Sequence, residues 1–287
     1  MIYTIKSDKL TAKIESRGAE LISLASKEQE YIWQGGAWKD HAPLLFPACG
    51  RIVGNTYTYR GKSYNMGIHG FARASEFALL EISDNRLVLV LEDYPESYSS
   101  FPFEFRLVAE FMLDGEMLTV NFTVYNNDEK AMPFMLGWHP GFVLWGEGAF
   151  ETFELDFGET NCVIHHPTTD TKFISGAIAS YPLKDGKYKL CPEEIYALDA
   201  LIFSDTLGKV KLSSPTTTER SVEVTWSENL PYVAFWKWPS EDTRYLCIEP
   251  WSGLPGDGVT PEVWENRLNI TLESGDSETF TYTVKCK

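Results

Sequence analysis

Hydrophobic and polar residues alternate along much of this chain. Apolar residues take every second position in Leu118–Val124, with polar residues between them, and Phe105–Phe111 repeats the pattern. Successive side chains of a β-strand point to opposite faces, so the alternation predicts strands with one buried face. Between the two runs, Asp114-Gly115 is typical of a tight turn, and the pair is expected to form a hairpin.

The same pattern extends over the rest of the chain. We expect two more hairpins, Leu268–Leu272 with Phe280–Val284 and Tyr57–Tyr59 with Ser63–Asn65, and single strands at Leu10–Ile14, Leu87–Leu91 and Val222–Trp226. Only Pro192–Ile195 is expected to make a short helical turn. No repeat, low-complexity segment or linker marks a boundary. Residues 1–287 are therefore predicted to form one all-β domain, a large antiparallel β-sandwich.

Composition supports the β assignment and narrows the classes of molecule that the protein is expected to bind. Aromatic residues make up 14% of the chain, with nine Trp, fourteen Tyr and seventeen Phe, and such residues suit pleated, half-buried surfaces. The formal net charge is −16. An acidic surface repels phosphate backbones and anionic lipid headgroups, so we expect no nucleic acid and no membrane partner. A neutral small molecule fits this charge better.

Several classes of chemistry lack their signatures. The five cysteines are scattered and form no C-x-x-C pair, which argues against a disulfide framework and a zinc site. No phosphate loop, dinucleotide-binding fingerprint, serine-hydrolase elbow or H-E-x-x-H pattern occurs. We therefore expect neither a metal nor an organic cofactor. The start of the chain has no basic segment followed by an apolar one, which favours a cytoplasmic protein.

Two histidines and one glutamate are the strongest candidates for catalysis. His69 and His139 are each flanked by glycine and bulky apolar residues, and a titratable group in such surroundings is hydrogen-bonded or functional. Taken singly, each is a structural histidine about as often as a catalytic one. Glu249 ends the apolar run Tyr245–Ile248, where a buried carboxylate is costly unless it is paired. It is either a salt-bridged strand end or a general base.

Other residues are suited to binding a sugar. Arg51 lies beside glycine and can donate two hydrogen bonds to neighbouring hydroxyls, while Asn55 can both donate and accept. In isolation, a loop-stabilising role for Arg51 is the commoner outcome. Trp251, like Trp138, Trp236 and Trp238, offers a ring that can stack on the C–H face of a pyranose, although each alone is more often a core residue.

The order of these motifs resembles the aldose 1-epimerase family, in its shorter, bacterial-type branch. The resemblance covers nearly the whole chain and rests on motifs in the family's order, namely Gly50-Arg51-Ile52 with Asn55, His69-Gly70-Phe71, His139-Pro140, Asp199 in a Leu-Asp-Ala-Leu-Ile-Phe segment, and Glu249. It implies a β-supersandwich fold of the galactose mutarotase type and interconversion of α and β anomers. One departure concerns Trp138, because longer members carry an asparagine before the acid histidine.

The resemblance also implies residue roles. His139 would be the general acid on the ring oxygen and Glu249 the general base on the anomeric hydroxyl. His69 and Arg51 would bind the ring oxygen or neighbouring hydroxyls, and Asp199 would accept from a ring hydroxyl. An imidazole and a carboxylate can hold opposite proton states near neutral pH, as ring opening requires.

Three alternatives stay open at this point. The chain could be a sugar-binding protein on the same fold, with little turnover. It could be a hexose 6-phosphate mutarotase, since a related branch uses several arginines. It could be a glycoside hydrolase that uses Glu249 with Asp199 or Asp257, because hydrolysis needs two carboxylates. The substrate is expected to be a small sugar in each case, and the protein a monomer or homodimer.

Overall fold

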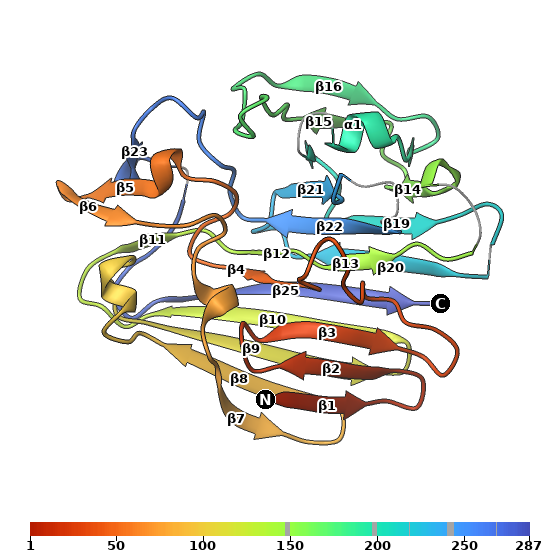
Figure 1. The fold of residues 1–287 in the computed structure, drawn as a ribbon, viewed down its shortest axis with the longest axis horizontal. Coiled ribbons are helices and arrows are strands. Elements are labelled where there is room, and N and C mark those ends of the chain that lie inside the picture. Colours follow the sequence, from red (N-terminus) through yellow and green to blue (C-terminus); the bar gives the residue numbers. More distant parts are fainter. Residues whose placement is uncertain (147–149, 197–199, 218, 240–243, 268) are drawn as a thin grey trace.

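Two large and three small β-sheets make up the part of the chain that the structure describes (Figure 1). The structure is a computed structural model and describes residues 1–146, 150–196, 200–217, 219–239, 244–267 and 269–287. Almost every strand pairing is antiparallel, and the one described α-helix, α1 (Pro192–Tyr196), is short. The all-β fold class is confirmed.

The larger sheet has nine strands, with β7 at one edge and β17 at the other. In spatial order its strands are β17 (Lys187–Lys189), β14 (Glu154–Asp156), β19 (Lys209–Ser213), β20 (Ser221–Trp226), β25 (Ser277–Cys286), β10 (Met117–Asn126), β9 (Phe105–Asp114), β8 (Arg86–Glu92) and β7 (Ala78–Ile82). Its centre is the predicted β9–β10 hairpin, whose alternating burial matches the sequence pattern.

The second large sheet carries the site described below. In spatial order its strands are β16 (Ala179–Pro182), β15 (Cys162–His165), β18 (Leu201–Ser204), β21 (Tyr232–Trp236), β22 (Tyr245–Trp251), β12 (Gly137–Trp138) and β4 (Leu44–Leu45), and β13 (Gly141–Val143) also pairs with β22.

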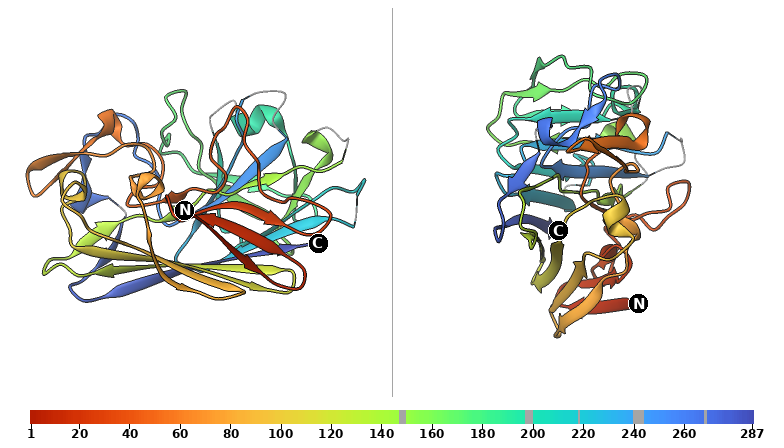
Figure 2. Two further views of the ribbon diagram at one scale, coloured as in Figure 1. Left: turned by 60° about the horizontal axis from the view of Figure 1, so that its bottom comes forward. Right: turned by 90° about the vertical axis from the view of Figure 1, so that its left-hand side faces the viewer.

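Three small sheets complete the described fold. They contain β1 (Ile2–Lys6), β2 (Thr11–Glu15) and β3 (Glu20–Ala25), then β11 (Met132–Phe134) with β24 (Ile270–Leu272), and finally β23 (Glu262–Val263), β5 (Thr56–Tyr59) and β6 (Lys62–Asn65). The N-terminal sheet lies against the β7–β9 side of the nine-stranded sheet (Figure 2), and apolar residues such as Ile14 and Leu89 share one core.

One of the expected hairpins is wrong. Strand β24 pairs with β11 and not with β25. The Asn126 side-chain amide donates to the carbonyls of Lys130 and Leu272, 2.9 Å each, and so links the end of β24 to the segment before β11. Strand β25 lies between β10 and β20. The β5–β6 hairpin is confirmed, with Arg60 and Gly61 both at positive φ in its two-residue turn.

The two large sheets pack face to face. Trp138 of β12 lies with its ring 6.4 Å from that of Phe122 on β10 and 5.5 Å from that of Tyr282 on β25. All three side chains are buried, and they belong to a single apolar cluster that joins both sheets. Trp138 therefore serves the core, and its indole nitrogen donates to the Ala42 carbonyl, 3.0 Å away.

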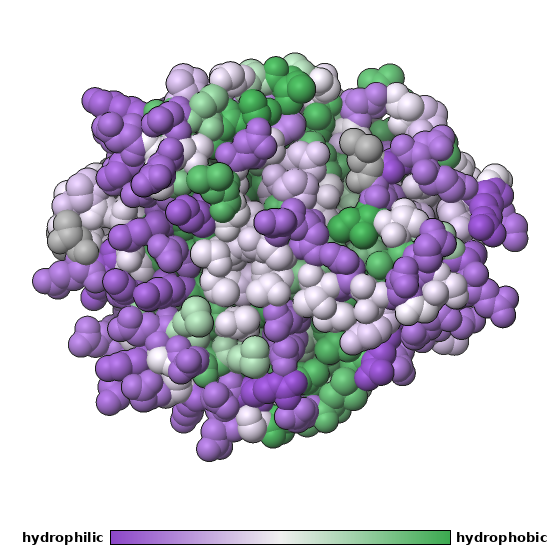
Figure 3. Space-filling model, turned by 180° about the vertical axis from the view of Figure 1, so that it is seen from behind, coloured by the Kyte–Doolittle hydropathy of each residue, from purple (hydrophilic) through white to green (hydrophobic). Residues whose placement is uncertain are grey.

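Strand β22 is buried on both faces, and its alternation separates core from site. Leu246 and Ile248 point into the core between the large sheets, whereas Cys247, Glu249 and Trp251 point to the opposite face. That opposite face forms the floor of a cavity. Hydrophilic residues cover much of the face shown in Figure 3, with paler and hydrophobic areas between them.

Candidate active site

The segments around Arg51 and His69 meet through the backbone. The His69 amide donates to the Gly50 carbonyl at 2.9 Å, and the Gly50 amide donates to Nδ1 of His69 at 3.1 Å. Because Nδ1 accepts a hydrogen bond, the proton of the neutral imidazole belongs on Nε2. Two motifs that are distant in the sequence thus form one wall of the site.

Glycine at position 70 allows the His69 segment to approach the Phe46 carbonyl closely. Its φ is +74°, and a Cβ at this position would lie 2.1 Å from the carbonyl oxygen of Phe46. That oxygen accepts hydrogen bonds from the amides of Phe71 and Ala72, so it has no room to move away. The glycine of the His-Gly-Phe motif is therefore required by backbone packing.

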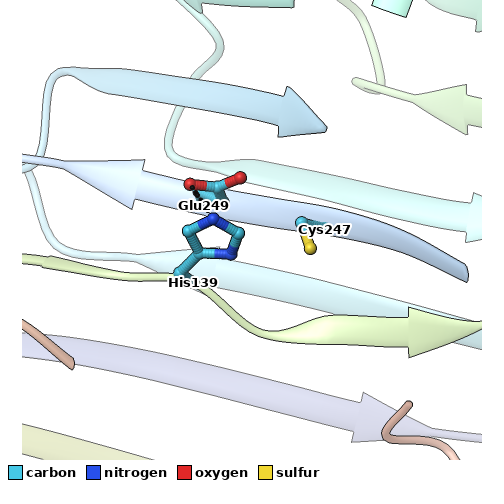
Figure 4. Close-up of side chains that lie close together, drawn as sticks. All are labelled: His139, Cys247 and Glu249. Carbon is cyan, nitrogen blue, oxygen red and sulfur yellow. Dashed lines mark ion pairs between the residues drawn. The ribbon is translucent and has the colours of Figure 1, made fainter. Parts of the chain in front are cut away.

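His139 and Glu249 come from different strands and face one another (Figure 4). His139 lies between β12 and β13, where its amide donates to the Pro43 carbonyl at 3.0 Å, and Glu249 lies on β22. The distance from imidazole Nε2 to carboxylate Oε2 is 3.2 Å. Glu249 is 1% exposed and His139 7%, so the two groups are in contact away from bulk water.

Burial sets the protonation of both histidines. It lowers the pKa of His139 to about 3, and the positive charge of Arg73 acts in the same direction. Burial also holds the pKa of His69 well below its usual value, and repulsion between the two imidazoles when both are protonated and the charges of Arg73 and Arg51 act in the same direction. Removing an imidazolium from water costs free energy, so both rings are neutral in the free protein at pH 7.

These side chains open onto one cavity of about 500 Å³. Arg51, His69, His139, Glu249 and Trp251 all line it. The volume falls in the usual range for small-molecule sites. Its remaining lining mixes aromatic and charged side chains, among them Trp38, Asp40, Arg73, Lys172, Trp236 and Trp238.

Two other expected residues, Asn55 and Asp257, do not join this group. Asn55 ends a short 3₁₀ turn (Val53–Asn55), is exposed, and is not part of the cavity lining. Asp257 is an exposed turn residue whose carboxylate accepts from the amides of Val259 and Thr260. Asp199 lies outside the residues that the structure describes.

Comparison with known proteins identifies the family. A sequence model described as aldose 1-epimerase matches residues 1–285. The chain belongs to the aldose 1-epimerase family. A galactose mutarotase related enzyme from Lactobacillus acidophilus has a TM-score of 0.93 and 29% identity, over 100% of this chain and 97% of that one.

Two further relatives agree with this result. A galactose mutarotase-like protein from Lactobacillus casei has a TM-score of 0.93 and 30% identity, with 100% of both chains covered. A chromosomal protein LacX from Lactococcus lactis is 28% identical over 94% of each chain. The fold is thus the galactose mutarotase type.

Among the described residues, no helix has the length and apolar character needed to cross a bilayer.

Sequence reasoning missed the loop before β4 as part of this epimerase-family site. Trp38 and Asp40 both line the cavity, and the Asp40 carboxylate accepts from the Arg73 guanidinium. No alternation or motif pointed to this segment. Its place follows from backbone bonds, since the carbonyls of His41 and Pro43 accept from the amides of Gly141 and His139. Such long-range pairing leaves no local signal.

A buried ion pair supports the opposite rim. Arg267 contacts Glu262 at 3.1 Å and donates to the Leu254 carbonyl at 2.6 Å. Leu254 belongs to the loop that links Trp251 to Pro255, and both of these residues line the cavity. Burial raises the pKa of Glu262 and lowers that of Arg267, while their mutual attraction opposes each shift. The pair anchors this loop to the body of the protein.

One cluster within the described residues has donors of the kind that bind metals. His139, Cys247 and Glu249 each offer one ligand atom, and these atoms lie within 4.8 Å of one another (Figure 4). The imidazole and carboxylate of this cluster are also the two acid–base candidates. The expectation of a metal-free reaction remains a prediction.

Proposed function

We propose that this protein is an aldose 1-epimerase that interconverts the α and β anomers of an aldose, with His139 as general acid and Glu249 as general base. The observation that carries the proposal is their contact, 3.2 Å from Nε2 to Oε2, in a cavity that also holds Arg51 and His69. Membership of the family supports the same roles.

Ring opening in this proposal moves two protons. Because His139 is neutral in the free protein, the step begins with a proton that His139 takes up with the sugar, and the imidazolium then lies against the Glu249 carboxylate. Glu249 takes the proton of the anomeric hydroxyl while the His139 imidazolium gives a proton to the ring oxygen, so the bond from C1 to the ring oxygen breaks and C1 becomes an aldehyde carbon. Rotation about the C1–C2 bond presents the other carbonyl face. Closure then reverses both transfers.

Binding groups hold the sugar during this exchange. The neutral His69 imidazole carries its proton on Nε2 and can donate to a hydroxyl or to the ring oxygen. Arg51 offers a planar set of donors that suits two neighbouring hydroxyls, and its Nε is buried without a hydrogen-bond partner among the described residues. Trp251 supplies an apolar surface for the C–H face of the ring. Asp199 and Asn55 stay as predicted contacts.

Polarimetry tests the activity directly. Freshly dissolved α-D-glucose and α-D-galactose are followed with and without protein, and the spontaneous rate is subtracted. We expect acceleration that Glu249→Gln and His139→Asn each reduce by about 100-fold or more. Glu223→Gln and His165→Asn, on strands outside the cavity, are matched controls that should keep the wild-type rate.

The substrate panel also includes hexose 6-phosphates. Arg51 and Lys172 line the same cavity, and the segment after Lys172 is held to its rim by a bond from the Ile174 amide to the Gly256 carbonyl, 3.0 Å. Sugar binding without acceleration of any anomerisation would favour a binding protein. Release of reducing sugar from a glycoside would favour a hydrolase. We expect the enzyme to act in the cytoplasm without a cofactor, as a monomer or homodimer.

A further inference from the structure

Among the described residues, the imidazole of His139 has no second hydrogen bond to another side chain or peptide group that would fix its orientation. Its Nε2 faces Glu249, but Nδ1 is buried and has no hydrogen-bond partner among the described residues. Acid–base histidines are commonly oriented by a bond from the other ring nitrogen to a carbonyl or carboxylate. Some other contact must therefore hold this ring.

Aromatic rings surround the imidazole instead. Trp38 stacks on it, with ring centroids 5.1 Å apart and an interplanar angle of 29°. Trp236 meets it edge-on at 5.5 Å and 78°, and His69 does so at 5.5 Å and 87°. These are the stacked and edge-to-face arrangements that aromatic pairs prefer. Of the three, only Trp38 covers a face of the ring.

Trp38 is itself held firmly. Its ring stacks on Tyr245 with centroids 5.2 Å apart and an angle of 20°, and the Tyr245 hydroxyl accepts from the Trp238 amide at 3.0 Å. The carbonyl of Trp38 accepts from the indole nitrogen of Trp33 at 3.1 Å. At 7% exposure, Trp38 has little freedom to swing into solvent.

Gly141 makes room for this stack. A Cβ at position 141 would lie 2.7 Å from Cζ3 of Trp38, which is closer than real Cβ contacts allow. Gly141 follows His139 by two residues, and its amide donates to the His41 carbonyl of the same loop that carries Trp38. This backbone hydrogen bond therefore fixes the position of Trp38 relative to His139.

We infer that Trp38 is a positioning residue for His139, holding the imidazole in its orientation towards Glu249 and keeping water from its face. Nothing in the sequence motifs assigns this role, and it rests on the proposed function only for its kinetic consequence. The orienting contact is an aromatic stack where a hydrogen bond would be usual.

Three variants separate this role from simple packing. Trp38→Leu removes the stacked ring, Trp38→Phe keeps a smaller one, and Gly141→Ala displaces Trp38 while leaving it in the chain. Trp145→Leu removes a buried indole that packs on Phe153, outside the cavity, and is the matched control for a generic loss of packing.

Steady-state kinetics of each variant measures kcat and KM separately. We expect Trp38→Leu to lower kcat by about 10- to 100-fold, with a smaller change in KM, because a misplaced acid costs rate rather than affinity. Trp38→Phe should recover part of the loss, and Gly141→Ala should show a loss of the same kind. A change confined to KM would overturn the inference, since Trp38 would then be only a surface for the sugar.

A second readout does not depend on turnover. NMR titration of labelled histidine follows the His139 imidazole in the wild type and in each variant. We expect water entry in Trp38→Leu to raise the pKa of His139 towards its ordinary value, while Trp145→Leu leaves it unchanged. An unchanged titration in Trp38→Leu overturns the inference. If Trp38→Leu shifts the titration of His139 but the wild type has no mutarotase activity, the proposed function is wrong and the positioning role of Trp38 still holds.

Discussion

Acid should destabilise this protein through its two buried histidines. The folded state holds the pKa of His139 at about 3 and that of His69 well below its usual value. In the unfolded chain both imidazoles return to a pKa of about 6.5. Between these values the unfolded state binds protons that the folded state does not, so the free energy of unfolding falls as the pH falls below 6.5.

The size of the effect follows from the same two pKa values. For His139, linkage gives a loss of about 2 kcal/mol in the free energy of unfolding between pH 7.5 and pH 5. His69 acts in the same direction and adds at most a similar amount. His139→Asn removes the first contribution and His69→Asn the second. Asparagine suits position 69 because His69 has a φ of +64°.

Urea unfolding at pH 7.5, 6.5, 5.5 and 5 measures these slopes. We expect His139→Asn to lose about 2 kcal/mol less than the wild type over this range, His69→Asn to lose less than the wild type by at most a similar amount, and the double variant to lose least. Leu118→Ala, a core truncation on β10, should shift the whole curve without changing its slope. A steeper acid loss in His139→Asn would refute the reasoning, because it would mean that the folded protein holds His139 charged against Glu249.

Three more predictions test the framework around the site. Gly70→Ala should lower the free energy of unfolding by more than about 3 kcal/mol in urea melts, because the new Cβ would lie 2.1 Å from the Phe46 carbonyl oxygen. The control Gly61→Ala, which has a similar φ but no atom near the new Cβ, should cost about 1 kcal/mol. Arg267→Met should cost about 3–5 kcal/mol by leaving the Glu262 carboxylate buried and unpaired, and adding Glu262→Met should recover most of it. Arg51→Met should raise KM about tenfold in polarimetry while kcat changes little.

The fold was largely predictable because its strands carry their own signal. The β9–β10 hairpin needed only alternation and an Asp-Gly turn, and both operate between neighbouring residues. The β24–β25 hairpin failed for the opposite reason. Strand β24 pairs instead with β11, which is distant in the sequence, and the Asn126 side chain bonds to the Leu272 carbonyl over a separation of 146 residues. Alternation predicts that a strand exists but not which partner it takes.

The site was predictable only in part, for a similar reason. His69, His139 and Glu249 stood out because titratable groups between glycines and apolar residues need a special explanation. Trp38 gave no such signal, since an isolated tryptophan in a loop is most often core or surface. Its contact with His139 arises from strand pairing, which a single sequence does not encode locally.

The charge of the site is consistent with the proposed reaction. Moving one proton from the anomeric hydroxyl to Glu249 and another from His139 to the ring oxygen leaves the summed charge of pair and sugar unchanged. A buried pair can undergo this exchange without creating a net charge away from water, which would be costly. The thiol of Cys247, two residues from Glu249 on β22, is a nearby nucleophile that could add to the open-chain aldehyde. Burial, with the charges of Glu249 and Asp40, raises the pKa of that thiol well above its usual value. We therefore expect the thiol to stay protonated and not to add to the aldehyde, since the thiolate is the nucleophilic form.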